Sequence, residues 1–301
     1  MAQQLVQLMP GQQVERWTIE KKLGEGGFGA VYRVYDATGR YALKVEGVNE
    51  QIQVLKLEVH VLTELTKRSS RHFCKIEDKG RFGGFNYVVM TLVGKSLENL
   101  VKSGPGGHMT LGCSLGVGIQ ALEALEDLHQ IGYLHRDVKP GNYAIGRPEL
   151  NEIRKVYILD FGMCRKFTND QVHKKYTRQR TKKDDCESWL YMQIELTGGR
   201  LPWHDIADMK QVGRMKQQYR ASPFMLFTPT CPTNELAQIL RIFDGLKYYD
   251  APPYQQVYGL IRSAMAANRV QEFPYDWEPG MERNSIRYQN ILSGPSAHML
   301  M

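Results

Sequence analysis

The chain has 301 residues, of which 42% are hydrophobic and 24% charged, with a formal net charge of +7. This composition excludes wholesale disorder, and because no apolar run reaches roughly eighteen residues, we expect no membrane span. The five cysteines are odd in number and widely spaced, which favours reduced thiols over a disulfide framework. The N-terminus has no secretory signal pattern. We therefore expect a cytoplasmic protein, with the nucleus as a second candidate location.

The predicted elements change character along the chain. Strands are expected at 17–23, 30–35, 41–45, 85–90 and 155–159, and helices at 53–65, 115–130, 188–196, 235–243 and 254–267. Residues 1–13 and 279–301 are polar and are expected to be flexible tails. The sequence therefore predicts an α+β fold in one domain at 14–278. Residues 14–93 would form an antiparallel sheet with one helix, and residues 94–278 would be mainly helical.

A glycine cluster lies between the first two predicted strands. Gly24, Gly26 and Gly29 fit the pattern G-x-G-x-x-G-x-V, which ends at Val31. The pattern alone is weak, because shuffling this composition yields it roughly a quarter of the time, so an ordinary glycine turn is the alternative. A dinucleotide-binding turn would open a helix, whereas this cluster leads into a strand. That context favours a backbone flap over nucleotide phosphates.

A lysine and a glutamate are spaced to meet across a strand and a helix. Lys44 lies on the third predicted strand, and Glu58 follows 14 positions later on the predicted helix. A cation that binds α- and β-phosphates needs an acid to hold it in place. Glu64 is the alternative partner, but Glu58 lies on the apolar face of the helix. We therefore predict a Lys44–Glu58 pair.

The strongest motif is His135-Arg136-Asp137-Val138-Lys139-Pro140-Gly141-Asn142, which fits H-R-D-x-K-x-x-N. Asp137 can accept the proton of a substrate hydroxyl, Lys139 can neutralise charge on a transferred phosphoryl group, and Asn142 can offer an oxygen to Mg²⁺. Asp160 opens an Asp-Phe-Gly triplet 23 positions after Asp137, at the end of an apolar strand. This position predicts the main Mg²⁺ ligand of an ATP-dependent phosphoryl transfer.

Together these motifs resemble the eukaryotic protein kinase family over about residues 14–278. Finer features are similar to the casein kinase 1 superfamily and its tau-tubulin kinase-like branch: VMTLVGKSLENL at 89–100, LHRDVKPGNYAIG at 134–146, DDCESWLYM at 184–192 and GRLPW at 199–203. The resemblance implies a two-lobed fold, ATP and Mg²⁺ as cofactors, and transfer to serine or threonine of protein substrates.

The resemblance also implies an adenine pocket. Met90 would guard its back, and the backbone of Thr91, Leu92 and Val93 would meet the ring. Apolar side chains would enclose the ring from both faces, namely Leu23, Val31, Ala42 and Ala144. Without the catalytic motif, plain core packing would explain these apolar residues equally well.

The segment after Asp160 departs from the family pattern. Asp185 follows Asp160 by only 25 positions, and the G-T-x-R-Y-x-S stretch of the casein kinase 1 superfamily is missing. The resemblance implies that this stretch would form the floor for the substrate peptide, so an ATP-binding pseudokinase or scaffold with impaired transfer is the alternative function.

The same segment concentrates positive charge. Residues 165–183 hold eight lysines and arginines against Asp170 alone. Such a run is often a solvated loop, or it meets acidic or phosphate-primed protein substrates. A nucleic-acid partner is less favoured, because few aromatics interleave with the charges. We expect a monomer.

Overall fold

The computed structural model describes residues 6–26, 29–50, 53–167, 181–247 and 250–279. Its described residues divide into two compact units. The first unit comprises Met1–Leu97, Gln120–Trp189 and Leu246–Pro252, and the second comprises Glu98–Ile119, Leu190–Gly245 and Pro253–Met301.

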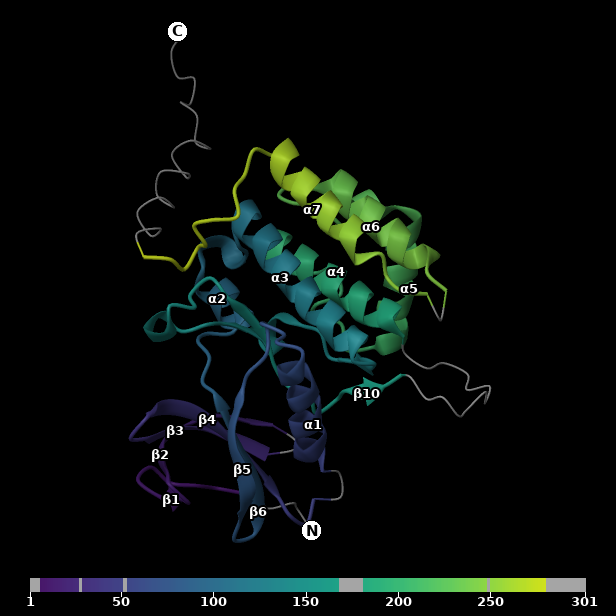
Figure 1. The fold of residues 1–301 in the computed structure, drawn as a ribbon. Helices are drawn as coiled ribbons and strands as arrows, with labels where there is room; N and C mark the ends of the chain where they lie inside the picture. The colour runs from purple at the N-terminus through teal and green to yellow at the C-terminus, as the bar shows by residue number, and fades with distance from the viewer. Residues whose placement is uncertain (1–5, 27–28, 51–52, 168–180, 248–249, 280–301) are drawn as a thin grey trace, which may run out of the picture. The chain divides into compact units, whose positions relative to one another are not determined.

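A six-stranded antiparallel sheet forms the N-terminal part of the first unit (Figure 1). Its strand order is β1 (Gln13–Val14), β2 (Trp17–Gly26), β3 (Gly29–Asp36), β4 (Gly39–Gly47), β6 (Phe85–Thr91) and β5 (Ile76–Phe82). Alternate side chains of each strand point to opposite faces, so Ala30, Tyr32 and Val34 of β3 are all buried in one core. The predicted antiparallel sheet is confirmed.

The segment before the sheet packs more closely than the expected loose tail. Leu8 is buried within the sheet's hydrophobic core. Its backbone N–H donates to the Tyr32 hydroxyl at 3.1 Å, and that hydroxyl donates to the Val6 carbonyl at 3.2 Å. The described part of the tail, residues 6–13, therefore packs against the core of the sheet, because Leu8 and the buried Tyr32 anchor it.

Helix α1 (Val54–Lys67) is the predicted helix of this region. Its buried residues follow helical spacing: Val54, Leu55, Glu58, Val61, Leu62 and Leu65. The rest of the first unit contains the short strands β7 (Tyr133–Leu134), β8 (Tyr143–Ile145), β9 (Val156–Ile158) and β10 (Arg165–Lys166), with the 3₁₀ turns η2 (Pro140–Asn142) and η3 (Pro148–Leu150). It also includes the end of α3 (Leu111–Gln130) and the start of α4 (Lys182–Gly198).

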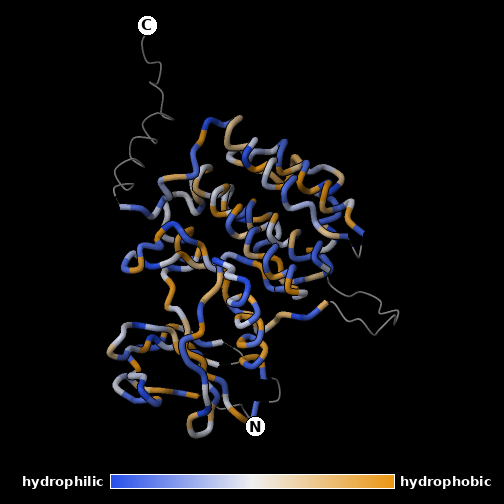
Figure 2. Tube along the Cα trace, viewed as in Figure 1, coloured by the Kyte–Doolittle hydropathy of each residue, from blue (hydrophilic) through white to orange (hydrophobic). Residues whose placement is uncertain are grey.

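The described residues of the second unit are mainly helical. Besides the rest of α3 and α4, it contains nearly all of α2 (Leu97–Ser103), then α5 (Met209–Ala221), α6 (Thr233–Gly245) and α7 (Tyr254–Ala267), with the 3₁₀ turns η1 (Pro105–Gly107) and η4 (Pro223–Met225). Helices α6 and α7 pack against each other through apolar stripes, and hydrophobic residues recur along both helices (Figure 2). The predicted α+β class is confirmed. Among the described residues, no helix combines the length and hydropathy needed to cross a bilayer.

Candidate active site

Every predicted chemistry-bearing residue lies in the first unit. The glycine cluster lies at the junction of β2 and β3, where Gly24 pairs with Val31 and Gly26 with Gly29. A Cβ atom on Gly24 or Gly26 would meet no described atom within 4 Å, whereas one on Gly29 would lie 2.0 Å from the Val45 carbonyl oxygen. Gly29 is therefore required by packing. Gly24 and Gly26 leave open space beside the backbone, as close approach of a phosphate requires.

Lys44 and Glu58 form the predicted pair. The Lys44 Nζ lies 2.5 Å from the Glu58 Oε2, and the Glu58 side chain is 4% exposed. The competing Glu64 pairs instead with the exposed Lys67. Burial raises the pKa of Glu58 against the opposing pull of Lys44. Burial would lower the pKa of Lys44, but the carboxylates of Glu58 and Asp160 outweigh it and raise that pKa. Lys44 is therefore a held cation at neutral pH.

Asp160 joins this pair from a distant part of the chain. Its Oδ1 lies 3.2 Å from the Lys44 Nζ and accepts a 3.4 Å hydrogen bond from the Gly162 N–H. Burial alone would raise the pKa of Asp160, but the Lys44 ammonium overrides it and lowers the pKa. The residue has a φ of 61°, a left-handed conformation that is uncommon outside glycine. The backbone thus holds an ionised carboxylate beside Lys44.

The catalytic motif forms a second cluster. The Asp137 Oδ2 accepts hydrogen bonds from the Lys139 Nζ at 2.7 Å and from the Asn142 Nδ2 at 2.9 Å. The Asn142 amide also donates to the Asp137 carbonyl at 2.8 Å, and the Leu159 N–H donates to the Asn142 carbonyl at 2.8 Å. This last bond ties the motif to the residue just before Asp160. The Asp137 carboxylate, the Lys139 ammonium and the Asn142 amide are thereby held together.

A buried carboxylate that the motif analysis left without a role supports this loop. Asp185 accepts hydrogen bonds from the backbone N–H groups of His135 and Arg136, each at 2.8 Å, and lies 2.9 Å from the His129 Nε2. Burial would raise the pKa of Asp185, but the hydrogen bonds, led by that from His129, lower it. Its partners lie about fifty positions away. No local sequence signal could have assigned this role.

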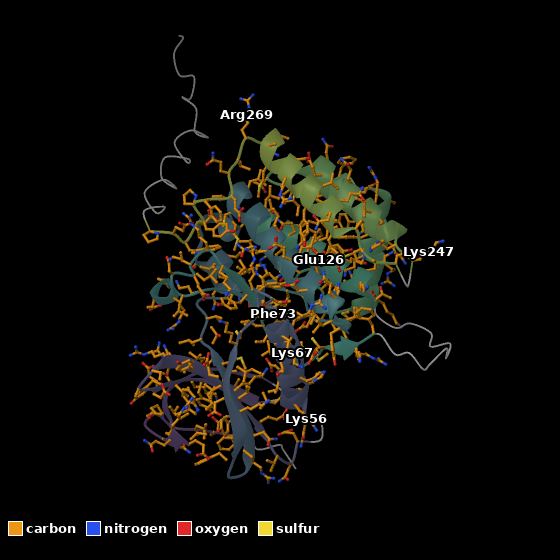
Figure 3. All side chains as sticks on the ribbon, in the orientation of Figure 1. Lys56, Lys67, Phe73, Glu126, Lys247 and Arg269 are labelled. Atoms are coloured by element: carbon orange, nitrogen blue, oxygen red, sulfur yellow. The ribbon has the colours of Figure 1, made fainter. Side chains whose placement is uncertain are left out.

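His135 is a neutral positioning group. The Asp137 N–H donates to its Nδ1 at 3.3 Å, so the Nε2 carries the proton and donates to the Leu159 carbonyl at 3.0 Å. Burial lowers the pKa of His135, which favours this neutral form. Phe161 lies between His135 and Phe73, with ring centroids 5.6 and 5.9 Å away; Phe73 is labelled in Figure 3. These contacts fix the residue next to Asp160.

The predicted adenine residues lie around the same strands. Ala42 pairs with the buried Met90, and Ala144 is buried beside Ser96 in an isolated bridge. The Thr91 N–H is already used, because it donates to the Lys75 carbonyl at 3.0 Å. Within the described part of the chain, the Val93 N–H donates no hydrogen bond. Of the remaining three, Leu92 is buried, Val31 is partly buried and Leu23 is 46% exposed.

The donor set fits a metal that arrives with a phosphorylated ligand. The described residues contain no group of three or more His, Cys, Asp or Glu that could hold a metal ion alone. Within the described residues, the Asp160 Oδ2 and the Asn142 Oδ1 accept no hydrogen bond. One carboxylate and one amide oxygen suit Mg²⁺, which keeps several waters and takes further ligands from phosphates.

Most of the basic run lies outside the described residues, including Lys174, Lys175, Arg178 and Arg180. Its described start, Arg165 and Lys166, is exposed on β10. The effect of the missing G-T-x-R-Y-x-S stretch on the peptide floor falls largely on this undescribed part and stays a prediction.

Comparisons with known proteins agree with this geometry. The family model described as "Protein kinase domain" matches residues 17–224. A probable serine/threonine-protein kinase of Dictyostelium discoideum is 33% identical over 287 residues, which cover 87% of this chain and 56% of that protein. A Caenorhabditis elegans protein named as a candidate casein kinase I is 28% identical over 302 residues, which cover 89% of this chain and 84% of that protein.

The chain thus spans little more than half the length of the Dictyostelium relative. Among solved structures, that of vaccinia related kinase 3 matches with a TM-score of 0.73 and 17% identity, covering 89% of this chain and 94% of that one. At this identity the match shows the protein kinase fold.

Proposed function

Because the chain belongs to the protein kinase family, we propose that it transfers the γ-phosphoryl group of ATP to serine or threonine hydroxyls of proteins, with casein kinase 1-like specificity. The named casein kinase I relative supports the finer assignment. The tau-tubulin kinase-like branch is part of the proposal and rests on the motifs at 89–100, 134–146, 184–192 and 199–203.

One observation carries the proposal. Lys44, Glu58 and Asp160 come from β4, α1 and the segment after β9, yet Lys44 contacts both carboxylates. A structural ion pair needs only one acid, whereas a phosphate-binding lysine beside a metal-binding aspartate needs both. The presence of the Asp137 cluster as well supports phosphoryl transfer over nucleotide binding alone.

Each residue has a role that its contacts suit. Lys44 binds the α- and β-phosphates while Glu58 holds it in place. Asp137 orients the substrate hydroxyl and accepts its proton, and Lys139 neutralises charge on the phosphoryl group in transit. Asp160 and Asn142 would hold Mg²⁺, which would supply positive charge to offset that of the ATP phosphates. Little covalent chemistry remains for the protein, because positioning supplies most of the rate.

We also propose that substrates are acidic or carry a primed phosphate. The exposed Arg165 and Lys166 at the start of the basic run support this preference, since cations near the reacting centre attract anionic segments.

Transfer of radiolabelled phosphate from ATP to casein and to a tubulin-derived substrate tests the proposal. We expect label on serine or threonine, and a loss of about 10²-fold or more in Asp137→Asn, which removes the proton acceptor. Equal incorporation by the parent protein and by Asp137→Asn would refute the proposed role of the site.

A further inference from the structure

A cavity lies in the first unit, apart from the Lys44 and Asp137 clusters. It has a volume of about 320 Å³, and its walls come from the β3–β4 turn, the segment 73–77, the end of β6 and the hairpin 147–157. It includes Thr91 and Leu92 of the predicted adenine segment but none of the residues in the Lys44 or Asp137 clusters. Its volume is at the small end of the range for ligand sites.

Positive charge dominates this cavity. Its lining contains Arg40, Lys75, Arg147 and Lys155 against two acids, Glu77 and Glu152. One of these acids is already satisfied, because the Glu152 carboxylate lies 3.0 Å from the Lys155 Nζ and accepts a 2.6 Å hydrogen bond from the Tyr157 hydroxyl. Glu77 remains as one carboxylate that opposes an anionic ligand.

Two of the four cations form no ion pair within the described residues. The Arg40 Nε lies 3.2 Å from the Oε2 of Glu20, a residue outside the cavity lining. Neither Lys75 nor Arg147 lies within ion-pair distance of a described carboxylate. The Arg147 Nε is buried and has no hydrogen-bond partner. Since that nitrogen is closed to solvent, a ligand would meet the charges of Lys75 and Arg147 rather than this donor.

Both unpaired cations extend from backbone that hydrogen bonds hold in place. The Lys75 N–H donates to the Thr91 hydroxyl at 2.9 Å, and its carbonyl accepts from the Thr91 N–H at 3.0 Å. The Arg147 carbonyl accepts from the N–H groups of Leu150 and Glu152, each at 3.1 Å. A guanidinium and an ammonium on fixed supports suit paired carboxylates, which accept bidentate hydrogen bonds from arginine.

We propose that this cavity binds an acidic peptide segment, whose carboxylates meet Lys75 and Arg147. The apolar wall formed by Phe73, Leu92 and Leu150 suits the methylene stems of glutamate side chains. A nucleic-acid backbone would instead need cations arrayed along an extended surface. The proposal is independent of phosphoryl transfer, because neither Lys75 nor Arg147 belongs to the Lys44 or Asp137 cluster; only Thr91 and Leu92 of the predicted adenine segment are shared with the cavity.

Hydrogen–deuterium exchange of the full chain with octaglutamate tests the proposal at the level of segments. At an octaglutamate concentration ten times its dissociation constant, amide exchange in residues 88–93 and 147–157 should slow by about tenfold. The Lys75→Gln/Arg147→Gln double variant should lose this protection. The matched control is Lys56→Gln/Lys79→Gln, which removes two exposed lysines outside the cavity and should keep it; Lys56 is labelled in Figure 3.

Three results would overturn the proposal: protection that octaglutamine produces equally, protection that survives in the cavity double variant, or octaglutamate protection that is absent from both segments. If the double variant binds Mg-ATP within about twofold as tightly as the parent, the variant is folded, because a twofold change in affinity corresponds to less than 1 kcal/mol. Failure of the catalytic proposal would appear separately, as loss of transfer activity in a chain that still shows the protection.

Discussion

The start of helix α1 gives a prediction about the active site that can be worked out from three buried groups. Glu46 is 1% exposed, and its Oε1 accepts hydrogen bonds from the Val54 N–H at 2.7 Å and the Leu55 N–H at 3.1 Å. The residue preceding the helix, Gln53, makes no side-chain cap. Glu46 therefore replaces the usual N-terminal cap from the neighbouring strand, two positions after Lys44.

Replacing Glu46 with alanine should destabilise the protein and loosen the Lys44–Glu58 pair. An unsatisfied buried N–H costs roughly 1–3 kcal/mol, so two of them, partly relieved by water, predict a loss of about 2–4 kcal/mol in the free energy of unfolding. Because Glu58 lies one turn further along α1, movement of the helix start should also weaken Mg-ATP binding by about tenfold, a change of 1.4 kcal/mol.

Urea unfolding and calorimetric titration with Mg-ATP measure the two effects. Glu46→Gln keeps an oxygen acceptor and should fall between the parent and the alanine variant. Glu149→Ala removes an exposed carboxylate and should change stability by less than about 0.5 kcal/mol. A Glu46→Ala protein as stable as this control would show that the two hydrogen bonds do not hold the helix.

Three further predictions concern the glycine cluster, His135 and Asp137. Gly29→Ala should cost about 2 kcal/mol or more in stability, because φ is 154° and the new Cβ would meet the Val45 carbonyl; Gly26→Ala, with open space, should unfold like the parent but bind ATP more weakly. Since burial lowers the pKa of His135 from 6.5, stability should fall as the pH drops below about 6.5, where the unfolded chain takes up the proton first. His135→Gln should flatten this part of the urea-unfolding profile, and an unchanged slope would contradict the assignment. Asp137→Asn should bind Mg-ATP within about twofold of the parent while transfer falls, and a parallel loss of both would contradict the division of roles.

Sequence patterns predicted the elements and contacts that depend on the spacing of neighbouring residues. Helix α1 follows from its apolar spacing, and the choice of Glu58 over Glu64 follows from the face on which it lies. Strand β5 was missed, because this edge strand is mostly exposed and carries charged residues without alternation. Helix α5 was missed for a similar reason, since none of its residues is buried.

Contacts between distant residues could not be predicted in the same way. Asp185 acts on a loop fifty positions away, and Leu8 is buried only because Tyr32 and the sheet surround it. Both depend on tertiary packing, which hydrophobic periodicity in the sequence does not predict. The cation-lined cavity is a further example, because Lys75 and Arg147 are 72 positions apart in the sequence.

Calorimetric titration of the full chain with Mg-ATP, repeated with Asp160→Ala, tests the central claim most directly. The convergence of Lys44, Glu58 and Asp160 predicts saturable binding at or below about millimolar concentration, in the range of ordinary enzyme–substrate affinities. It also predicts that the metal-dependent part of this binding disappears in the variant. A folded parent protein that takes up no Mg-ATP at millimolar concentration, or a variant that binds it equally well, would contradict the account.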